Sequence, residues 1–161
     1  MAPRIVIRVA KKVFRMLTAQ KVPHALAGGL AVELHGFNRV TMNVDFVVPR
    51  SCQRILGEQF GLSTPIRGHL AGICVQSNAV PIHLLFVAKP RRRGDLSFAP
   101  QHVGLPFIGV DALIAMKVCA GRLKDMVDIV ELLEVGNSYD ARACSITSTL
   151  LSGGACDGTL R

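Results

Sequence analysis

The chain has 161 residues, half of them hydrophobic, which is enough for one domain with a buried core. No apolar run reaches the roughly 18 residues that a membrane span needs, so we expect a soluble protein without membrane contact. Lys and Arg number 19 against 11 Asp and Glu, a formal charge of +8. This excess favours a polyanionic partner, although a merely basic surface is an equal alternative.

The cysteine pattern argues against both a disulfide framework and a zinc site. The five cysteines are odd in number and no pair has Cys-x-x-Cys spacing. The pattern favours reduced thiols, and with them a cytoplasmic location.

The N-terminal third predicts a helix, a short strand and a second helix. Apolar residues recur at helical spacing over Ile5–Gln20, with basic residues on the other side. A short apolar run, His24–Ala27, leads into Gly28 and Gly29, and a helix-compatible segment, Leu30–Gly36, follows. A strand that turns through two glycines into a helix leaves backbone N–H groups at a positive dipole end, where a phosphate can bind.

The next predicted strand, Asn43–Val48, carries two polar residues at its start. A loop that holds Arg39 and Thr41 precedes it. Because side chains alternate along a strand, Asn43 and Asp45 are expected to share one face.

The middle of the chain predicts further strands around one helix. The expected elements before the next core strand are a helix and two short strands: Ser51–Gln59, Thr64–Arg67 and Gly72–Gln76. Val80–Ala88 is typical of a buried strand, with apolar residues on both faces, and it contains His83. Lone histidines in apolar strands more often form core hydrogen bonds than bind ligands.

Two later segments are less regular. Lys89–Asp95 contains three adjacent arginines, Arg91–Arg93, which either grip phosphates or form a solvated basic loop. Gln101–Ile108 is an edge-strand candidate interrupted by Pro106.

The segment Leu113–Leu133 predicts helical structure, with Asp111 as its N-cap. Its apolar stripe is expected to comprise Met126, Ile129, Val130 and Leu133. Its charged residues are Lys117, Arg122, Lys124, Asp125 and Asp128. One interpretation of these charges is an ion-pair network that locks two helices over the sheet, with both aspartates on one helix face.

These motifs resemble the nucleotidyltransferase superfamily, which has the fold of DNA polymerase beta. The glycine pair followed by Asn43-x-Asp45 is similar to its x-D-x-D arrangement, and the later segment to the Leu-Ile-Ala-x-Lys and Arg-x-Lys-Asp-x-x-Asp pattern. The closest likeness is to the small bacterial branch of antitoxin, toxin and resistance-type transferases that includes the AbiEii-like proteins. The resemblance runs from about Val22 to Val135, and it implies an α/β (α+β) fold with helices packed on a small mixed β-sheet.

The resemblance also implies a catalytic site in which two of the three usual carboxylates are replaced. Asn43 stands in place of the first aspartate and His83 in place of the third, so Asp45 alone remains. The implied catalytic residues are Asp45, Asn43 and His83, and Asp45 and Asn43 are the implied ligands of Mg²⁺ or Mn²⁺. The implied nucleotide-binding residues are Gly28, Gly29, Arg39, Thr41, Lys117, Arg122 and Lys124, with Asp125 and Asp128 as structural or rim acids.

The implied function is transfer of a nucleoside monophosphate from a nucleoside triphosphate to an acceptor hydroxyl, weakened by Asn43 and His83. The alternative is a non-catalytic member that binds a nucleotide, a nucleic acid or a partner protein, for example as a toxin–antitoxin-like component. A plain structural remnant with no ligand is the third hypothesis. Beyond Gly136 the periodicity ends. We therefore predict a nucleotidyltransferase-like domain over residues 1–136 and an irregular, flexible tail over residues 137–161.

Overall fold

The computed structural model describes residues 3–37, 39–61, 64–66, 71–87, 101–102 and 104–136. The predicted arginine loop, Arg91–Arg93, and the predicted tail, residues 137–161, lie outside this part of the chain. No helix within it is long and apolar enough to cross a membrane.

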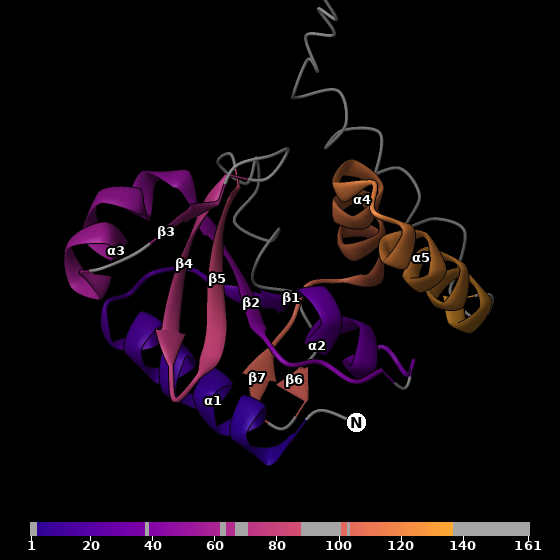
Figure 1. Cartoon of the computed structure of the whole chain (residues 1–161), viewed down its shortest axis with the longest axis horizontal. Helices are drawn as coiled ribbons and strands as arrows, with labels where there is room; N and C mark the ends of the chain where they lie inside the picture. The colour runs from indigo at the N-terminus through magenta and orange to yellow at the C-terminus, as the bar shows by residue number, and fades with distance from the viewer. Residues whose placement is uncertain are drawn as a thin grey trace, which may run out of the picture.

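Five strands form one mixed sheet with the order β1-β2-β5-β4-β3, as predicted for the fold class (Figure 1). The strands are β1 Ala25–Ala27, β2 Val44–Pro49, β3 Thr64–Ile66, β4 Gly72–Ser77 and β5 Val80–Val87. The central strands β2 and β5 are parallel, and every other neighbouring pair in this sheet is antiparallel. Because β2 is buried along its whole length, its residues read as an almost continuous apolar run.

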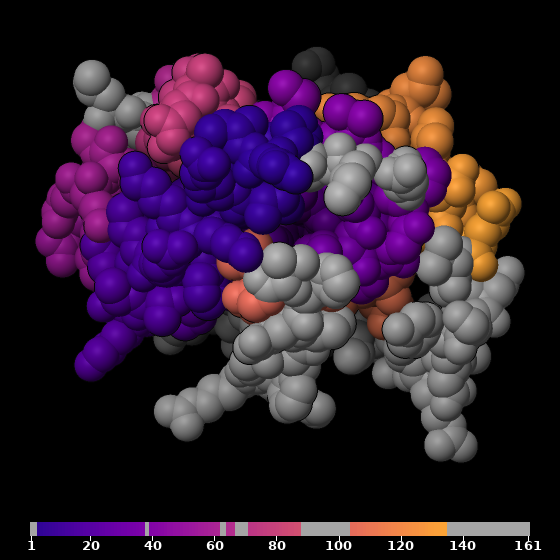
Figure 2. Space-filling model, turned by 90° about the horizontal axis from the view of Figure 1, so that it is seen from below, coloured from indigo at the N-terminus to yellow at the C-terminus, as the bar shows by residue number. Residues whose placement is uncertain are grey.

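The helices surround this sheet, with α3 and the α4–α5 pair at opposite ends of the molecule (Figure 1). They are α1 Arg4–Ala19, α2 Gly28–Leu34, α3 Gln53–Phe60 with the short 3₁₀ helix η1 Arg50–Cys52 before it, α4 Val110–Ala120 and α5 Leu123–Gly136. The predicted amphipathic helix is confirmed, since α1 buries Val9, Val13 and Leu17 in the core. Figure 2 shows α1, in indigo, spread over one face of the molecule.

Three local predictions are wrong. Helix α2 begins at Gly28, so the glycine pair forms its first turn rather than preceding it. The segment predicted as one edge strand forms a separate two-stranded hairpin of β6 Gln101–His102 and β7 Leu105–Pro106. Asp111 lies in the first turn of α4, and Gly109 is the N-cap.

The predicted apolar stripe of α5 is mostly exposed rather than buried, and of its four residues only Ile129 is half-buried. Met126, Val130 and Leu133 are 41%, 55% and 54% exposed, whereas Asp125 and Asp128 are almost fully buried. Helical periodicity locates an apolar face correctly but does not decide which face of the helix meets the sheet. Here the buried ion pairs described below decide it.

One core contact gives the fold a pH dependence. The ring of His24 packs edgewise against Phe14 and Phe46, and its Nδ1 donates a hydrogen bond to the Val22 carbonyl oxygen at 2.7 Å. Its Nε2 is buried and has no hydrogen-bond partner among the described residues. Burial disfavours the imidazolium and lowers the pKa of His24, and the bond to Val22 opposes this only in part.

We therefore expect acid to destabilise the fold through His24. The unfolded chain takes up the proton near the ordinary histidine pKa of 6.5, while the folded chain resists it. The stability is thus fully present above that pKa and is lost as the pH falls through it. Urea unfolding at a series of pH values should show a shallower acid loss for His24→Phe than for the unmodified chain. Equal pH slopes in the two proteins would contradict this role.

Candidate functional site

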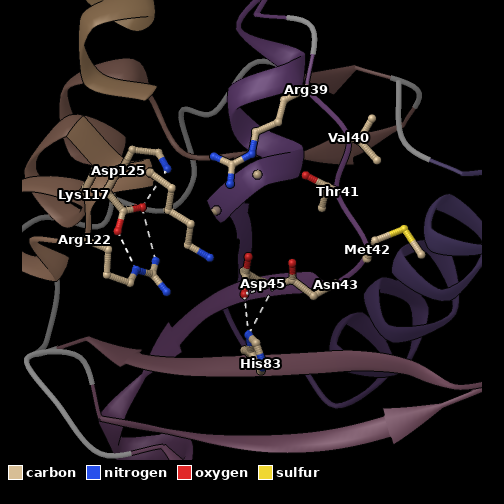
Figure 3. Close-up of a pocket in the computed structure, with 13 residues that line it drawn as sticks. Arg39, Val40, Thr41, Met42, Asn43, Asp45, His83, Lys117, Arg122 and Asp125 are labelled. Atoms are coloured by element: carbon tan, nitrogen blue, oxygen red, sulfur yellow. Dashed lines mark hydrogen bonds and ion pairs between the residues drawn. The ribbon is translucent and has the colours of Figure 1, made fainter. Parts of the chain in front are cut away.

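A polar cavity of about 280 Å³ lies where the two central strands meet α2, α4 and α5 (Figure 3). Its lining residues are Gly28, Gly29, Arg39, Val40, Thr41, Met42, Asn43, Asp45, His83, Lys117, Arg122, Lys124 and Asp125. They come from segments far apart in the sequence. Lys117, Arg122 and Asp125 face Asn43 and Asp45 across the cavity.

The glycine pair leaves room for two side chains of the site. Gly28 has φ +61°, and a Cβ built on it would lie 1.8 Å from Asp45 Oδ2. A Cβ on Gly29 would lie 2.1 Å from Thr41 Oγ1. Position 28 therefore requires glycine for its backbone conformation as well as for space, whereas a side chain at position 29 would first have to displace the Thr41 hydroxyl. The glycines allow Asp45 and Thr41 to pack against the start of α2. This packing role is additional to the phosphate binding predicted for the glycine pair.

Asp45, Asn43 and His83 form one hydrogen-bonded group. Asp45 pairs with His83 in the parallel register of β2 and β5, so the two side chains lie side by side. Asp45 Oδ1 accepts hydrogen bonds from Asn43 Nδ2 and from His83 Nδ1, each at 2.7 Å. Asn43 comes directly before β2, and its bond to Asp45 confirms the prediction that both polar residues face the same side.

This group does not fit the Mg²⁺ that the family resemblance implies. Mg²⁺ prefers several hard oxygen ligands, and here one carboxylate stands beside an amide and an imidazole. The amide of Asn43 presents its nitrogen, not its oxygen, to Asp45. Within the described part of the chain, no group of three His, Cys, Asp or Glu side chains could hold a metal ion.

A buried ion-pair cluster forms the opposite wall of the cavity and confirms the predicted network between α4 and α5. Lys117 Nζ lies 3.3 Å from Asp125 Oδ1 and 2.5 Å from Asp128 Oδ2, and all three side chains are almost fully buried. Arg122 Nε donates to Asp125 Oδ2 at 2.5 Å, and Arg39 pairs with Asp128. The cluster thus joins both helices to the loop before β2.

The cluster shifts the pKa of two of its members. Burial alone would raise the pKa of Asp125, but the hydrogen bond from Arg122 and the charge of Lys117 outweigh it and lower that pKa. The hydrogen bond to Asp125 raises the pKa of Arg122. Because the folded pKa of Asp125 is depressed, its contribution to stability is present above the ordinary value of 3.8 and is lost as the pH falls through the folded pKa.

The structure brings most of the predicted site residues to this cavity. Asp128 is the exception, because it pairs with Lys117 and Arg39 but does not line the cavity. The roles of these residues in binding or catalysis stay predictions. Val40 and Met42 also line the cavity and are 70% and 63% exposed, and the sequence motifs did not point to them. Their position in the sequence, between the predicted site residues Arg39, Thr41 and Asn43, could have indicated that they line the cavity.

Comparison with known proteins identifies the fold. No protein-family model matches the sequence, and no curated protein matches it in sequence. Among solved structures, the solution structure of the antibiotic-resistance factor ANT(2'')-Ia matches with a TM-score of 0.61 at 13% identity, over 91% of each chain. Its crystal structure with adenylyl-2''-tobramycin matches with 0.59 at 14% identity, over 91% of this chain and 97% of that one.

A Thermotoga maritima protein described as a nucleotidyltransferase matches with a TM-score of 0.53 at 13% identity, over 83% of this chain and 96% of that one. The chain therefore has the nucleotidyltransferase fold, as its sequence motifs predicted.

The ion-pair cluster gives a stability prediction. Lys117→Met removes a cation that contacts both buried aspartates, and we expect it to cost about 3 kcal/mol because buried charges lose their partner. Lys124→Met, at an exposed position of the same cavity, is the matched control and should change stability by less than about 0.5 kcal/mol. The measurement is urea unfolding near neutral pH. A Lys117→Met protein as stable as the control would show that the cluster does not hold the helices.

Proposed function

We propose that this chain binds a nucleoside triphosphate in the cavity and acts as a slow nucleotidyltransferase. The observation that carries the proposal is the cavity itself, where Asp45 of β2, packed against Gly28, faces Lys117 and Arg122 within a nucleotidyltransferase fold. In the ANT(2'')-Ia complex the ligand is an adenylylated tobramycin, which supports an acceptor hydroxyl as the second substrate.

The cations of the cavity can hold phosphate oxygens even though they already pair with carboxylates. Arg122 has five N–H donors, and its bonds to Asp125 use its Nε and one terminal nitrogen. Its side chain is 60% exposed, so its other donors can reach a ligand. Charge-assisted bonds of this kind are the strong ones in phosphate recognition. Lys124, at the exposed start of α5, adds a second cation to the same rim.

In the transfer step the acceptor hydroxyl oxygen bonds to the α-phosphorus and loses its proton to water. The bond from that phosphorus to the bridging oxygen breaks, which releases pyrophosphate. The chain's own residues bind the triphosphate and orient it over Asp45. Oriented charge supplies most of the acceleration in such reactions. With a single carboxylate at the site, we expect a low rate.

A specific observation favours a second candidate function, which is binding without transfer. Asn43 and His83 both donate hydrogen bonds to Asp45, so the three residues form a closed polar group rather than a set of open metal ligands. Such a protein would bind a nucleotide, a nucleic acid or a cognate protein, as in a toxin–antitoxin-like pair of the AbiEii-like branch.

Calorimetry with ATP tests the binding part of the proposal. Replacing both rim cations, as Arg122→Gln with Lys124→Gln, should weaken ATP binding about 10- to 100-fold, because charge-assisted hydrogen bonds are lost. Arg54→Gln is the matched control, since Arg54 is an exposed cation on α3 away from the cavity. Equal affinity in the double variant and the control, or no ATP binding by the unmodified chain with or without Mg²⁺, would refute a triphosphate site here.

Restoring the carboxylates tests the transfer part. The double variant Asn43→Asp with His83→Asp should bind Mn²⁺ measurably more tightly than the unmodified chain, because three carboxylates then share one site. It should also release pyrophosphate from ATP at least about tenfold faster, with water as the acceptor. Adding Asp45→Asn to the double variant is the control and should cancel both gains. Tighter Mn²⁺ binding without any pyrophosphate release would favour the binding function over transfer.

A further inference from the structure

Helix α5 turns an apolar face to the outside of the molecule. Its large hydrophobic residues recur at three- and four-residue steps along that face, and their exposed fractions range from 41% to 85%. These residues, which we call the α5 stripe, are Leu123, Met126, Val127, Val130 and Leu133. In Figure 2, α5 lies at the edge of the molecule. Contiguous exposed apolar surface of this kind marks an interaction site more often than scattered single residues do.

The stripe cannot turn inward, because the opposite face of α5 is fixed. Asp125, Asp128 and Leu132 on that face are 1%, 2% and 1% exposed. Both aspartates are bonded to Lys117, and Asp128 is also bonded to Arg39. Rotating the helix to bury the stripe would separate these buried ion pairs, which is strongly unfavourable. The apolar face is therefore a fixed outer surface of the domain.

We infer that α5 packs antiparallel against α5 of a second copy of this chain, through the stripe. The spacing resembles the apolar seam of a two-stranded coiled coil, which is self-complementary across a two-fold axis. A two-fold axis passing near the middle of the stripe, between Val127 and Asp128, brings residues at equal distances before and after it into contact.

The charges beside the stripe favour this antiparallel arrangement. Lys124 and Glu131 are seven residues apart, so they lie two turns apart on the same flank of the stripe. In an antiparallel pair, this flank of one helix packs against the same flank of the other helix, with the chain running in the opposite direction. Lys124 of each copy then lies opposite Glu131 of the other copy, which gives two ion pairs. A parallel pair would bring this flank against the other side of the stripe, where Ile129 lies, and would form neither ion pair.

Analytical ultracentrifugation of the full chain over a wide concentration range tests the dimer. We expect a reversible dimer whose dissociation constant rises at least about 100-fold in Val130→Glu, because the new charge would be buried in the apolar seam. Ile55→Glu, at a 47% exposed position on α3, is the matched control and should dimerise as the unmodified chain does. Unchanged circular dichroism would exclude misfolding of either variant.

A charge exchange tests the orientation. Lys124→Glu and Glu131→Lys should each weaken the dimer, and the two changes together should restore it, because the exchanged pairs attract again. A chain that stays monomeric at hundreds of micromolar, as it would if another segment or another protein covered the stripe, overturns the inference. A dimer that tolerates Val130→Glu, or that the double exchange does not restore, also overturns it.

Discussion

The close approach of Asp45 to Gly28 is the constraint on which the rest of the site depends. A carboxylate oxygen occupies the space where any other residue would place its Cβ, and the positive φ of Gly28 starts α2 at that point. The parallel pairing of β2 with β5 then brings His83 beside Asp45. Thr41 repeats the arrangement one residue later against Gly29. The glycine pair thus fixes where the polar side chains of two strands and a loop converge.

The opposite wall of the cavity depends on a different interaction, the burial of two aspartates around one lysine. Lys117 holds Asp125 and Asp128, and the arginines complete the neutralisation of both carboxylates. This cluster has two consequences. It leaves the exposed side of Arg122 toward the cavity, and it orients α5 so that its apolar face points away from the domain. The candidate site and the inferred dimer surface therefore share one structural cause.

Much of the fold could be predicted because the hydrophobic pattern within each segment indicates its secondary structure. The amphipathic pattern of α1, the apolar run of β5 and the helical structure predicted over Leu113–Leu133, which α4 and α5 provide, all follow from periodicity. The alternation rule placed Asn43 and Asp45 on one face, and the motif order placed His83 near them. The hairpin β6–β7 was missed because two-residue strands leave almost no periodic signal.

The orientation of α5 could not be predicted from the same rules. Its apolar residues follow helical spacing, and a sequence alone favours burying them. Only the three-dimensional placement of Lys117 opposite Asp125 and Asp128 shows that the charged face is the inner one. The close approach of Asp45 to Gly28 could not be predicted for a similar reason. It is a contact between two segments, and the local sequence of neither segment indicates it.

The most direct measurement is a crystal structure of the chain with a non-hydrolysable nucleoside triphosphate and Mn²⁺. We expect the phosphates to lie between the glycine turn and Arg122, with the guanidinium in contact with a phosphate oxygen and Asp45 facing the α-phosphate. A triphosphate bound outside this cavity, or a cavity that stays without it at saturating concentration, would contradict the account of this site.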